Sequence, residues 1–455
     1  MIIENNDSQT SPGGGIALYD VGINTTKLKI TENAIIQNNT SCNTVNAGGG
    51  IYLSKARLFI SGSAKIINNK AGDDDHLTSP GGGIYCGATA TDVGSVNIGY
   101  FDEGEIDPNC SLTISGNSAK GDGRGIYMKG GTLNIAGRTI QSNTAGGKGS
   151  AIYFGSSGSF NVTSRAYIYG GSSKEHDVCL ASGKKITLGH IETTPGWNNA
   201  AAISLESYSD GAQVFEAAEG VTLKSEITWF GVNPETLGDG TKKDWFLRMD
   251  GKIYEKAGSK SSPSAVGDIV FEDGSAEAYS ADLSLTNILK NKAKDVIVKI
   301  DGGSKIAVSK TRVTYKYWAT NSANRDKVAG LVCTPGGSVG SYSFSGTTNG
   351  SNCLNVMKAF DSSYSSSKYP AFGAACNDSY YLPSIAELYW MWQNRDTVNN
   401  ALQKIGTPTT NEVLWSCSQK SDLDYYAWYF DMGTCECGNE KKWLKQCNVR
   451  AFRRY

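Results

Sequence analysis

The segment Gly48-Gly49-Gly50-Ile51-Tyr52 decides the fold of the first third of the chain, because close copies of it recur. The copies are Gly13-Gly14-Gly15-Ile16, Gly81-Gly82-Gly83-Ile84-Tyr85, Gly123-Arg124-Gly125-Ile126-Tyr127 and Gly149-Ser150-Ala151-Ile152-Tyr153. Successive isoleucines of these copies are 35, 33, 42 and 26 residues apart. A unit that recurs at this period and cannot bury its own apolar face stacks on its neighbours. The repeat therefore predicts a scaffold of stacked units.

Each repeat contains two further apolar pieces. One is an alternating strand, such as Leu58-Phe59-Ile60 or Leu133-Asn134-Ile135, whose outer residues share one face. The other is an Ile-x-x-Asn piece, which occurs at Ile35–Asn38, Ile66–Asn69, Ile114–Asn117 and Ile140–Asn143. Asn suits a bend because it tolerates left-handed backbone and bonds to the coils above and below. Three short strands per repeat predict a right-handed parallel β-helix.

The domain organisation follows from where the repeat starts, loosens and ends. Ile3-Glu4-Asn5-Asn6 resembles the end of a repeat, so we expect an export or anchoring signal upstream of this sequence. We expect Trp245–Arg248 and Asp250–Ile253 to form a closing hairpin. The predicted parts are β-helix repeats over 1–175, terminal coils and a cap over 176–256, a linker over 257–264, and a second domain over 265–455.

Composition excludes several classes of function. The 43 basic and 44 acidic residues nearly cancel and form no basic stripe, so we expect no nucleic-acid partner. No apolar run is long enough to cross a bilayer. The chain has eleven cysteines and three histidines but no Cys-x-x-Cys pair, so we expect no metal site. Asp73-Asp74-Asp75-His76 is interpreted as a solvated loop rather than a calcium site.

No catalytic residue and no cofactor are expected. A carbohydrate-active β-helix would need clustered carboxylates projecting from one strand face, and the sequence shows no such pattern. No histidine follows His190, so no imidazole is available to activate a thiol in the C-terminal part. We therefore expect a protein that is not an enzyme.

The C-terminal part has helix signals followed by strand signals. Ser384 and Glu387 have the spacing of a capping box at the start of a helix. A second helix is predicted with Val398, Leu402 and Ile405 on one face, ending at Gly406. Three strand-like segments follow, at Val413–Ser416, Ala427–Asp431 and Asn448–Phe452.

Two resemblances accompany these patterns. The repeats resemble those of polymorphic outer-membrane proteins and related bacterial surface adhesins. The C-terminal part resembles the C-type-lectin-like domain of the formylglycine-generating-enzyme-like branch, and within it the variable proteins of diversity-generating retroelements. The motifs that carry the second resemblance occur in the order Tyr369–Phe372, Tyr381–Ser384, Trp415–Gln419, Ala427-Trp428 and Val449–Arg453. Together the two resemblances imply a mainly β chain whose second domain is α+β.

The second resemblance implies a ligand-binding face built from the last strands and loops. In that family, codons for this face are rewritten at template adenines, which turns Asn codons into Tyr, Asp, Ser or Cys but not into Trp. The candidate variable face is Cys417, Tyr425, Tyr426, Tyr429, Asp431, Cys435, Cys437, Trp443, Gln446 and Cys447. Cys435, Cys437 and Cys447 are alternatively a disulfide set, whereas Trp415 and Trp428 are expected in the core.

The sequence thus predicts an extracellular or cell-surface adhesin or receptor. Its expected partner is a protein or glycan on another cell or host surface. Two alternatives stay open: a carbohydrate-active β-helix enzyme with an accessory binding head, and a purely structural repeat protein. Binding of a sugar through calcium is disfavoured, because the Glu-Pro-Asn and Trp-Asn-Asp motifs of calcium-dependent lectins do not occur.

Overall fold

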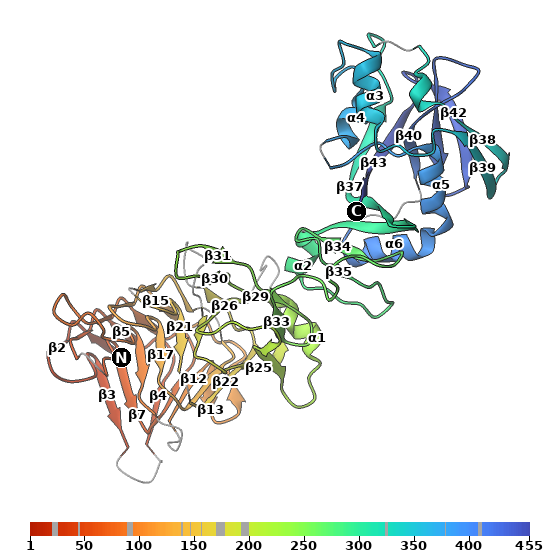
Figure 1. Cartoon of the computed structure of the whole chain (residues 1–455). Coiled ribbons are helices and arrows are strands. Elements are labelled where there is room, and N and C mark those ends of the chain that lie inside the picture. Colours follow the sequence, from red (N-terminus) through yellow and green to blue (C-terminus); the bar gives the residue numbers. More distant parts are fainter. Residues whose placement is uncertain are drawn as a thin grey trace. The chain divides into compact units, whose positions relative to one another are not determined.

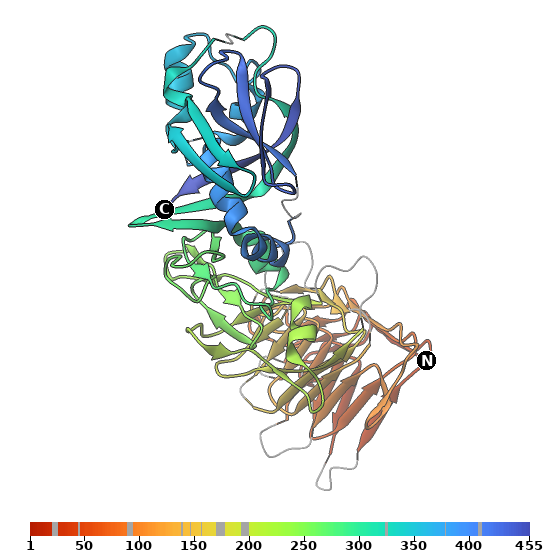
Figure 2. The same ribbon diagram turned by 90° about the vertical axis from the view of Figure 1, so that its right-hand side faces the viewer.

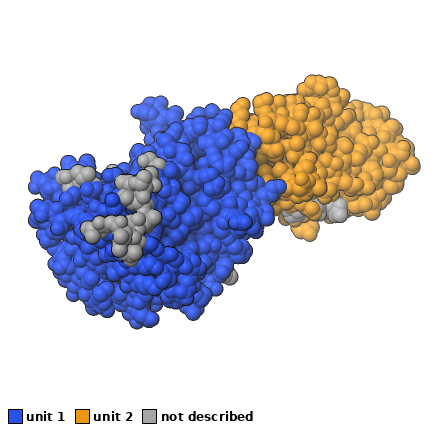
Figure 3. Space-filling model, turned by 90° about the horizontal axis from the view of Figure 1, so that it is seen from below, with its two compact units in different colours: residues 1–255 blue, residues 256–455 orange. Residues whose placement is uncertain are grey.

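The computed structural model divides the chain into two compact units, Met1–Glu255 and Lys256–Tyr455 (Figure 3). The expected boundary between residues 175 and 176 lies outside the described residues. The structure describes residues 1–20, 26–43, 46–88, 94–137, 140–145, 147–155, 157–169, 178–192, 200–323, 326–377, 379–407 and 412–455.

Most strands of the first unit form four parallel sheets, because each complete repeat adds one strand to each sheet (Figures 1 and 2). The first sheet contains β1 (Ile2–Glu4), β5 (Ile35–Gln37), β9 (Lys65–Ile67), β15 (Thr113–Ser115), β19 (Ile140–Gln141) and β23 (Ile168–Tyr169). The second contains β2 (Asp7–Ser8), β6 (Thr40–Ser41), β10 (Lys70–Ala71), β16 (Ser118–Ala119) and β20 (Thr144–Ala145). The third contains β3 (Ile16–Tyr19), β7 (Ile51–Ser54), β11 (Ile84–Cys86), β17 (Ile126–Met128), β21 (Ile152–Phe154), β24 (Val178–Leu180), β26 (Ala201–Leu205) and β29 (Phe230–Val232). The fourth contains β4 (Lys27–Ile30), β8 (Arg57–Ile60), β12 (Ser95–Ile98), β18 (Thr132–Ile135), β22 (Ser159–Ser164), β25 (Ile186–Ile191) and β28 (Phe215–Ala217).

The register places equivalent residues of successive repeats side by side. Ile51 pairs with Ile16 on one side and with Ile84 on the other, as the repeated Gly-rich segment predicts. The long spacing of 42 residues arises from an antiparallel hairpin of β13 (Tyr100–Asp102) and β14 (Glu105–Ile106), which is inserted between β12 and β15.

Two details of the predicted repeat were wrong. Each complete repeat has four strands rather than three, because the two-residue strands of the second sheet carry no apolar signal. The first Ile-x-x-Asn piece is also displaced by one residue. Ile36, not Ile35, pairs with Ile66, so Asn39 rather than Asn38 is the residue equivalent to Asn69.

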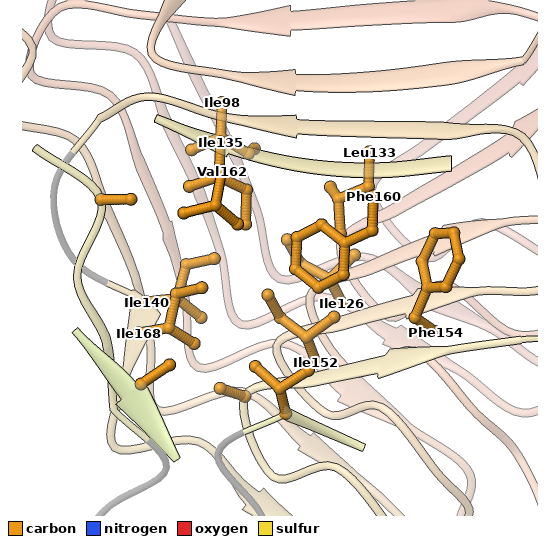
Figure 4. Packing of buried hydrophobic residues seen from close by; sticks show 14 of the residues in the cluster. Ile98, Ile126, Leu133, Ile135, Ile140, Ile152, Phe154, Phe160, Val162 and Ile168 are labelled. Carbon is orange, nitrogen blue, oxygen red and sulfur yellow. The ribbon is translucent and has the colours of Figure 1, made fainter. Parts of the chain in front are cut away.

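The core of the first unit is a set of aliphatic columns that run across the sheets. Ile98, Ile135 and Val162 are buried at paired positions of the fourth sheet, and Figure 4 shows their side chains beside one another. Ile126 and Ile152 continue the core from the third sheet. Because every repeat contributes the same positions, the apolar interior extends through the unit.

The last part of the first unit closes one end of its sheets. The expected hairpin is confirmed, since β32 (Phe246–Leu247) pairs antiparallel with β33 (Lys252–Tyr254). The remaining elements here are β27 (Ala212–Gln213), α1 (Leu223–Glu226), the 3₁₀ turn η1 (Ile227–Trp229), β30 (Glu235–Thr236) and β31 (Lys242–Lys243).

The second unit is built on a sheet of eight strands. Only β40 and β43 pair in parallel, and the other neighbours are antiparallel. The order is β35 (Ala276–Glu277), β34 (Ile269–Phe271), β36 (Ala293–Asp301), β37 (Ser304–Tyr317), β43 (Gln446–Arg454), β40 (Val413–Gln419), β41 (Tyr426–Asp431) and β42 (Glu436–Lys441). The other elements are α2 (Asn287–Lys292), η2 (Ala329–Leu331), the hairpin β38 (Cys333–Ser338) and β39 (Ser341–Gly346), α3 (Cys353–Phe360), α4 (Pro370–Ala375), α5 (Ile385–Gln393) and α6 (Arg395–Lys404).

The local sequence signals correctly predict the last two helices of the second unit. Ser384 caps α5 as the sequence predicts: its Oγ accepts from the backbone N–H of Glu387, whose carboxylate accepts from the Ser384 N–H. The expected linker over 257–264 is instead held to the sheet. Lys260 forms a β-bridge with Ala276, and its Nζ lies 2.8 Å from the buried carboxylate of Asp268.

Candidate functional site

The last four strands present the expected binding residues on a firmly packed base. Trp415 on β40 and Trp318 are both fully buried, as expected for Trp415. The Trp415 indole donates to the Lys316 carbonyl at 2.8 Å, and the Trp318 indole donates to the Ser416 carbonyl at 2.9 Å. Both indoles therefore have their polar atoms satisfied inside the unit, and they link β40 to the chain around β37.

Three of the ten expected residues do not lie on any surface. Cys417, Cys435 and Cys447 are each 2 % exposed or less. Burial raises the pKa of the Cys447 thiol to about 12, so this sulfur is a neutral, inward-facing group. Their codons alone place these three cysteines on the binding face, but codon content does not show on which side of a strand a residue lies. Cys435, Cys437 and Cys447 all carry free thiols.

Aromatic side chains gather where β41 begins and β42 ends. Tyr425 is 41 % exposed, and its ring centroid lies 5.2 Å from that of Tyr426 and 6.1 Å from that of Trp443. Strand pairing explains the meeting: Tyr426 pairs with Lys441, so the turn that follows β42 returns beside Tyr425. The Lys441 ammonium lies 6.0 Å from the Tyr425 ring.

Tyr429 forms a second aromatic position further along β41. Its cross-strand partner is Gly438, and a Cβ there would lie 2.1 Å from Cζ of the tyrosine ring. The ring therefore lies flat across a strand that has no side chain at that point. On its other side the Lys445 ammonium is 3.5 Å from the ring centroid, a close cation–π contact. We call Tyr425, Tyr426, Tyr429 and Trp443, with Lys441 and Lys445, the aromatic end of the sheet.

The remaining expected residues have more modest settings. Asp431 is half-buried, and its Oδ1 accepts from the backbone N–H groups of Gly433 and Thr434 at 2.8 and 3.1 Å, which closes the β41–β42 turn. The backbone N–H of Cys437 donates to the Tyr342 hydroxyl at 3.2 Å, so the β38–β39 hairpin supports β42. Gln446 is exposed at the start of β43.

Lys442 is a supporting residue that sequence reasoning missed. Its side chain is completely buried, and its ammonium lies 4.8 Å from the Trp318 ring. Nζ donates to the carbonyls of Asp326 and Asp424 at 3.0 and 2.8 Å, and the Lys442 N–H donates to the Tyr425 carbonyl at 3.1 Å. Lys442 thus holds the loop that presents Tyr425. Nothing in the run Lys441-Lys442 distinguishes the buried lysine from its neighbour.

A second set of buried charges fixes the strand ends beneath the site. The Arg450 guanidinium is buried, and its Nε donates to Glu412 at 3.2 Å; Arg312 donates to the same carboxylate at 2.9 Å. Arg454 donates to the buried Glu387 at 2.8 Å, which ties β43 to the start of α5. Arg450 and Arg454 thus both pair with carboxylates near the end of the chain.

The side chains of the aromatic end are partly exposed. A cleft of about 410 Å³ exists elsewhere in the second unit, beside Lys294, Lys310 and Tyr380, and none of the ten expected residues lines it. Flat, partly exposed aromatic rings flanked by lysines are suited to contact with another surface or with a sugar ring.

Comparison with known proteins gives no family for this chain. No family model matches it, and no curated protein matches it. Among solved structures it is similar to a fimbrial protein from Bacteroides ovatus, with 12 % sequence identity and a TM-score of 0.30. That match covers 42 % of this chain and 48 % of the other, so it spans less than half of the fimbrial protein. In the part of the chain that the structure describes, no helix is long and apolar enough to cross a membrane.

Proposed function

We propose that this protein is a cell-surface adhesin or receptor that binds a protein or glycan ligand through the aromatic end of its second unit. In this proposal the first unit is a parallel β-helix stalk and the second is a C-type-lectin-like head. The observation that carries the proposal is the ordered aromatic group around Tyr425, Trp443 and Tyr429, which stays partly exposed.

Binding through such an ordered aromatic group costs little conformational entropy. Tyr and Trp offer large amphipathic surfaces, and they lose little rotamer entropy because each has only two side-chain torsions. Tyr429 is already confined between Gly438 and Lys445, and Tyr425 is carried by the loop that Lys442 holds. Side chains that are ordered before binding pay a smaller entropic cost on binding.

The buried cysteines change which positions we propose to vary. Tyr425, Tyr426, Tyr429, Asp431 and Gln446 reach the surface and remain candidates for adenine-directed variation. Cys417, Cys435 and Cys447 are core residues, so variation there would be limited by packing. Trp443 is a candidate contact residue that does not arise from an Asn codon.

The binding role is tested with the full chain on an array of host and bacterial glycans and on intact epithelial cells. We expect Trp443→Ala to weaken any binding that is found by about tenfold or more, the loss typical of an aromatic hot spot. Tyr19→Ala is the matched control, because Tyr19 is 50 % exposed and its ring lies beside that of a neighbouring tyrosine in the first unit. Equal binding by both variants would refute the aromatic end as the binding site. Cleavage of an arrayed glycan would favour the enzyme alternative.

The diversification role is tested by deep sequencing of codons 414–455 in a population of the source cells. We expect substitutions at Tyr425, Tyr426 and Tyr429 that trace to template adenines, with Trp415 and Lys442 unchanged. An invariant tail would leave an adhesin of fixed specificity. Substitutions spread evenly over buried and exposed positions would point to relaxed selection rather than to directed variation.

A further inference from the structure

Three side chains with different donor atoms meet at one corner of the first unit. The Cys42 sulfur, a carboxylate oxygen of Asp73 and a ring nitrogen of His76 all lie within 4.8 Å of one another. The Asp73 Oδ1 is 2.6 Å from the His76 Nδ1. Cys42 is 2 % exposed, whereas the Asp73 and His76 side chains are about one-third exposed.

The stacking of repeats brings these residues together. Cys42 follows β6 directly, and Gly72-Asp73 follows β10, the strand that pairs with β6. Because Ala71 pairs with Ser41, the chain leaves both strands at the same corner, and the Gly72 N–H donates to the Ser41 carbonyl at 2.8 Å. Asp73 Oδ1 then accepts from the N–H groups of Asp75 and His76, a turn that brings the imidazole back over the carboxylate. The group is not evident from the sequence, because Asp73 and His76 are 31 and 34 residues away from Cys42.

We propose that Cys42, Asp73 and His76 form a binding site for a divalent transition-metal cation, of which Zn²⁺ is the best match. A thiolate, an imidazole and a carboxylate are the three donor types that zinc takes, and this mixture is unsuited to calcium or magnesium. In a tetrahedral zinc site, bonds of about 2.0–2.3 Å separate neighbouring donor atoms by roughly 3.3–3.8 Å. The Asp73–His76 separation of 2.6 Å is shorter than that range and no separation exceeds 4.8 Å, so rotation of the Asp73 and His76 side chains has to bring the three donor atoms to the spacing of a zinc site. The partial exposure of those two side chains leaves a fourth position for water.

Metal binding replaces contacts that hold the empty site. The Cys42 thiol hydrogen-bonds to Asp73. When the cation binds, a metal–sulfur bond forms, the S–H bond breaks, and the proton passes to buffer. The hydrogen bond between Asp73 and His76 opens so that each side chain donates to the cation instead. The sequence interpretation of residues 73–76 was a solvated loop rather than a calcium site, and zinc binding here would add a role that the loop sequence alone does not suggest.

The test uses the full chain, freed of metal with a chelator and titrated with Co²⁺ and then with Zn²⁺. We expect one cation per chain, a thiolate-to-cobalt charge-transfer band that Zn²⁺ abolishes, and release of one proton per cation in calorimetry. Cys42→Ser should lose the band. His76→Ala should weaken binding by more than about tenfold, since even the loss of a residue that only orients a ligand costs this much.

Two matched pairs separate this site from the other thiols of the chain. Asp73→Asn keeps the oxygen that accepts from Asp75 and His76, so the turn survives, but it removes the carboxylate and should weaken binding by a similar factor. Asp74→Asn alters a neighbouring carboxylate that is fully exposed and paired with Lys120, and it should bind as the natural chain does. His190→Ala is the control for His76. A band that persists in Cys42→Ser, equal affinities for Asp73→Asn and Asp74→Asn, or the absence of any band would each overturn the proposal.

Discussion

At the scale of single residues, Asn69 shows how a buried amide holds successive repeats together. Its side chain is completely buried. Its Oδ1 accepts from the backbone N–H and Nδ2 of Asn39 at 3.1 and 3.0 Å, and its Nδ2 donates to Ile36 and Asn117 oxygens at 3.0 Å. Each asparagine of this ladder thus forms hydrogen bonds with backbone groups at a bend, where the backbone is not paired with a neighbouring strand. Burying polar groups is stabilising only while every partner is present.

Asn69→Ala should therefore destabilise the first unit by about 3 kcal/mol, because it leaves several buried donors and acceptors without partners. Asn134→Ala is the matched control. Asn134 also lies in an asparagine ladder, between Asn97 and Asn161, but on a half-exposed face that water reaches. Its loss should cost less than about 1 kcal/mol. Urea unfolding followed by circular dichroism measures both, and similar losses would show that burial of the ladder is not the deciding factor.

Asp361 gives the second unit a dependence on acid. The Tyr369 hydroxyl and the Ser363 hydroxyl each donate to its carboxylate at 2.7 Å, and they lower its pKa from 3.8 to about 2. A folded-state pKa below the unfolded value means that the stabilisation is present above pH 3.8 and is lost as the pH falls towards 2. Asp361→Asn should lose up to about 2 kcal/mol at pH 6. The difference in unfolding free energy between the natural chain and this variant should shrink by pH 2.5; a constant difference would contradict the assignment.

At the scale of elements, the turn between β42 and β43 depends on the buried Lys442 rather than on its half-buried neighbour Lys441. The buried ammonium donates two hydrogen bonds to carbonyls and lies 4.8 Å from the Trp318 ring. Lys442→Met keeps the apolar stem but leaves the Asp326 and Asp424 carbonyls without this donor. We expect a loss of about 3 kcal/mol, because hydrogen bonds from a buried charged group are among the stronger ones.

Lys441→Met is the comparison for that prediction. Lys441 precedes the buried lysine directly, is half-buried, and lies 6.0 Å from the Tyr425 ring. Its substitution should change the unfolding free energy by less than about 1 kcal/mol. Thermal unfolding of both variants measures the contrast. If Lys441→Met were the more damaging change, the turn would be held by surface charge instead.

Helices and strands that are marked by a local sequence signal could be predicted. Strands that form only because a neighbouring strand pairs with them could not. The capping box of Ser384 and Glu387 lies within four residues, so the sequence alone predicts the start of α5. The strand β42 has the sequence Glu-Cys-Gly-Asn-Glu-Lys, which has little strand preference and forms because β41 pairs along its whole length. Ile35 and Ile36 are equally good by pattern, and only stacking on Ile66 decides between them.

The sequence predicts which residue types the candidate site contains, but not which of their side chains face the surface. Tyr425, Tyr429 and Trp443 could be proposed because large aromatics at strand ends are suited to binding. Cys417 and Cys447 could not be separated from them by codon content, since burial depends on which side of the sheet each strand position faces. The Cys42–Asp73–His76 group needed the register of two repeats before its members could be seen together.

At the scale of the whole molecule, each unit has the means to fold on its own core. A single cluster of buried apolar residues runs from Ile30 to Ile253 within the first unit, whereas Val270, Ile297 and Ala307 pack together within the second. Residues that pack into one core unfold together as one cooperative unit. We therefore expect two transitions in scanning calorimetry of the full chain.

Two of the substitutions above identify which unit gives rise to each transition. Asn69→Ala should lower the temperature of one transition and leave the other in place, while Lys442→Met should do the reverse, since changes at distant sites with separate partners act independently. Saturating Zn²⁺ should raise only the transition that Asn69→Ala lowers, because a ligand stabilises the unit that binds it. A single transition that both substitutions lower would show that the two cores unfold as one, and the second unit would then depend on the first for its stability.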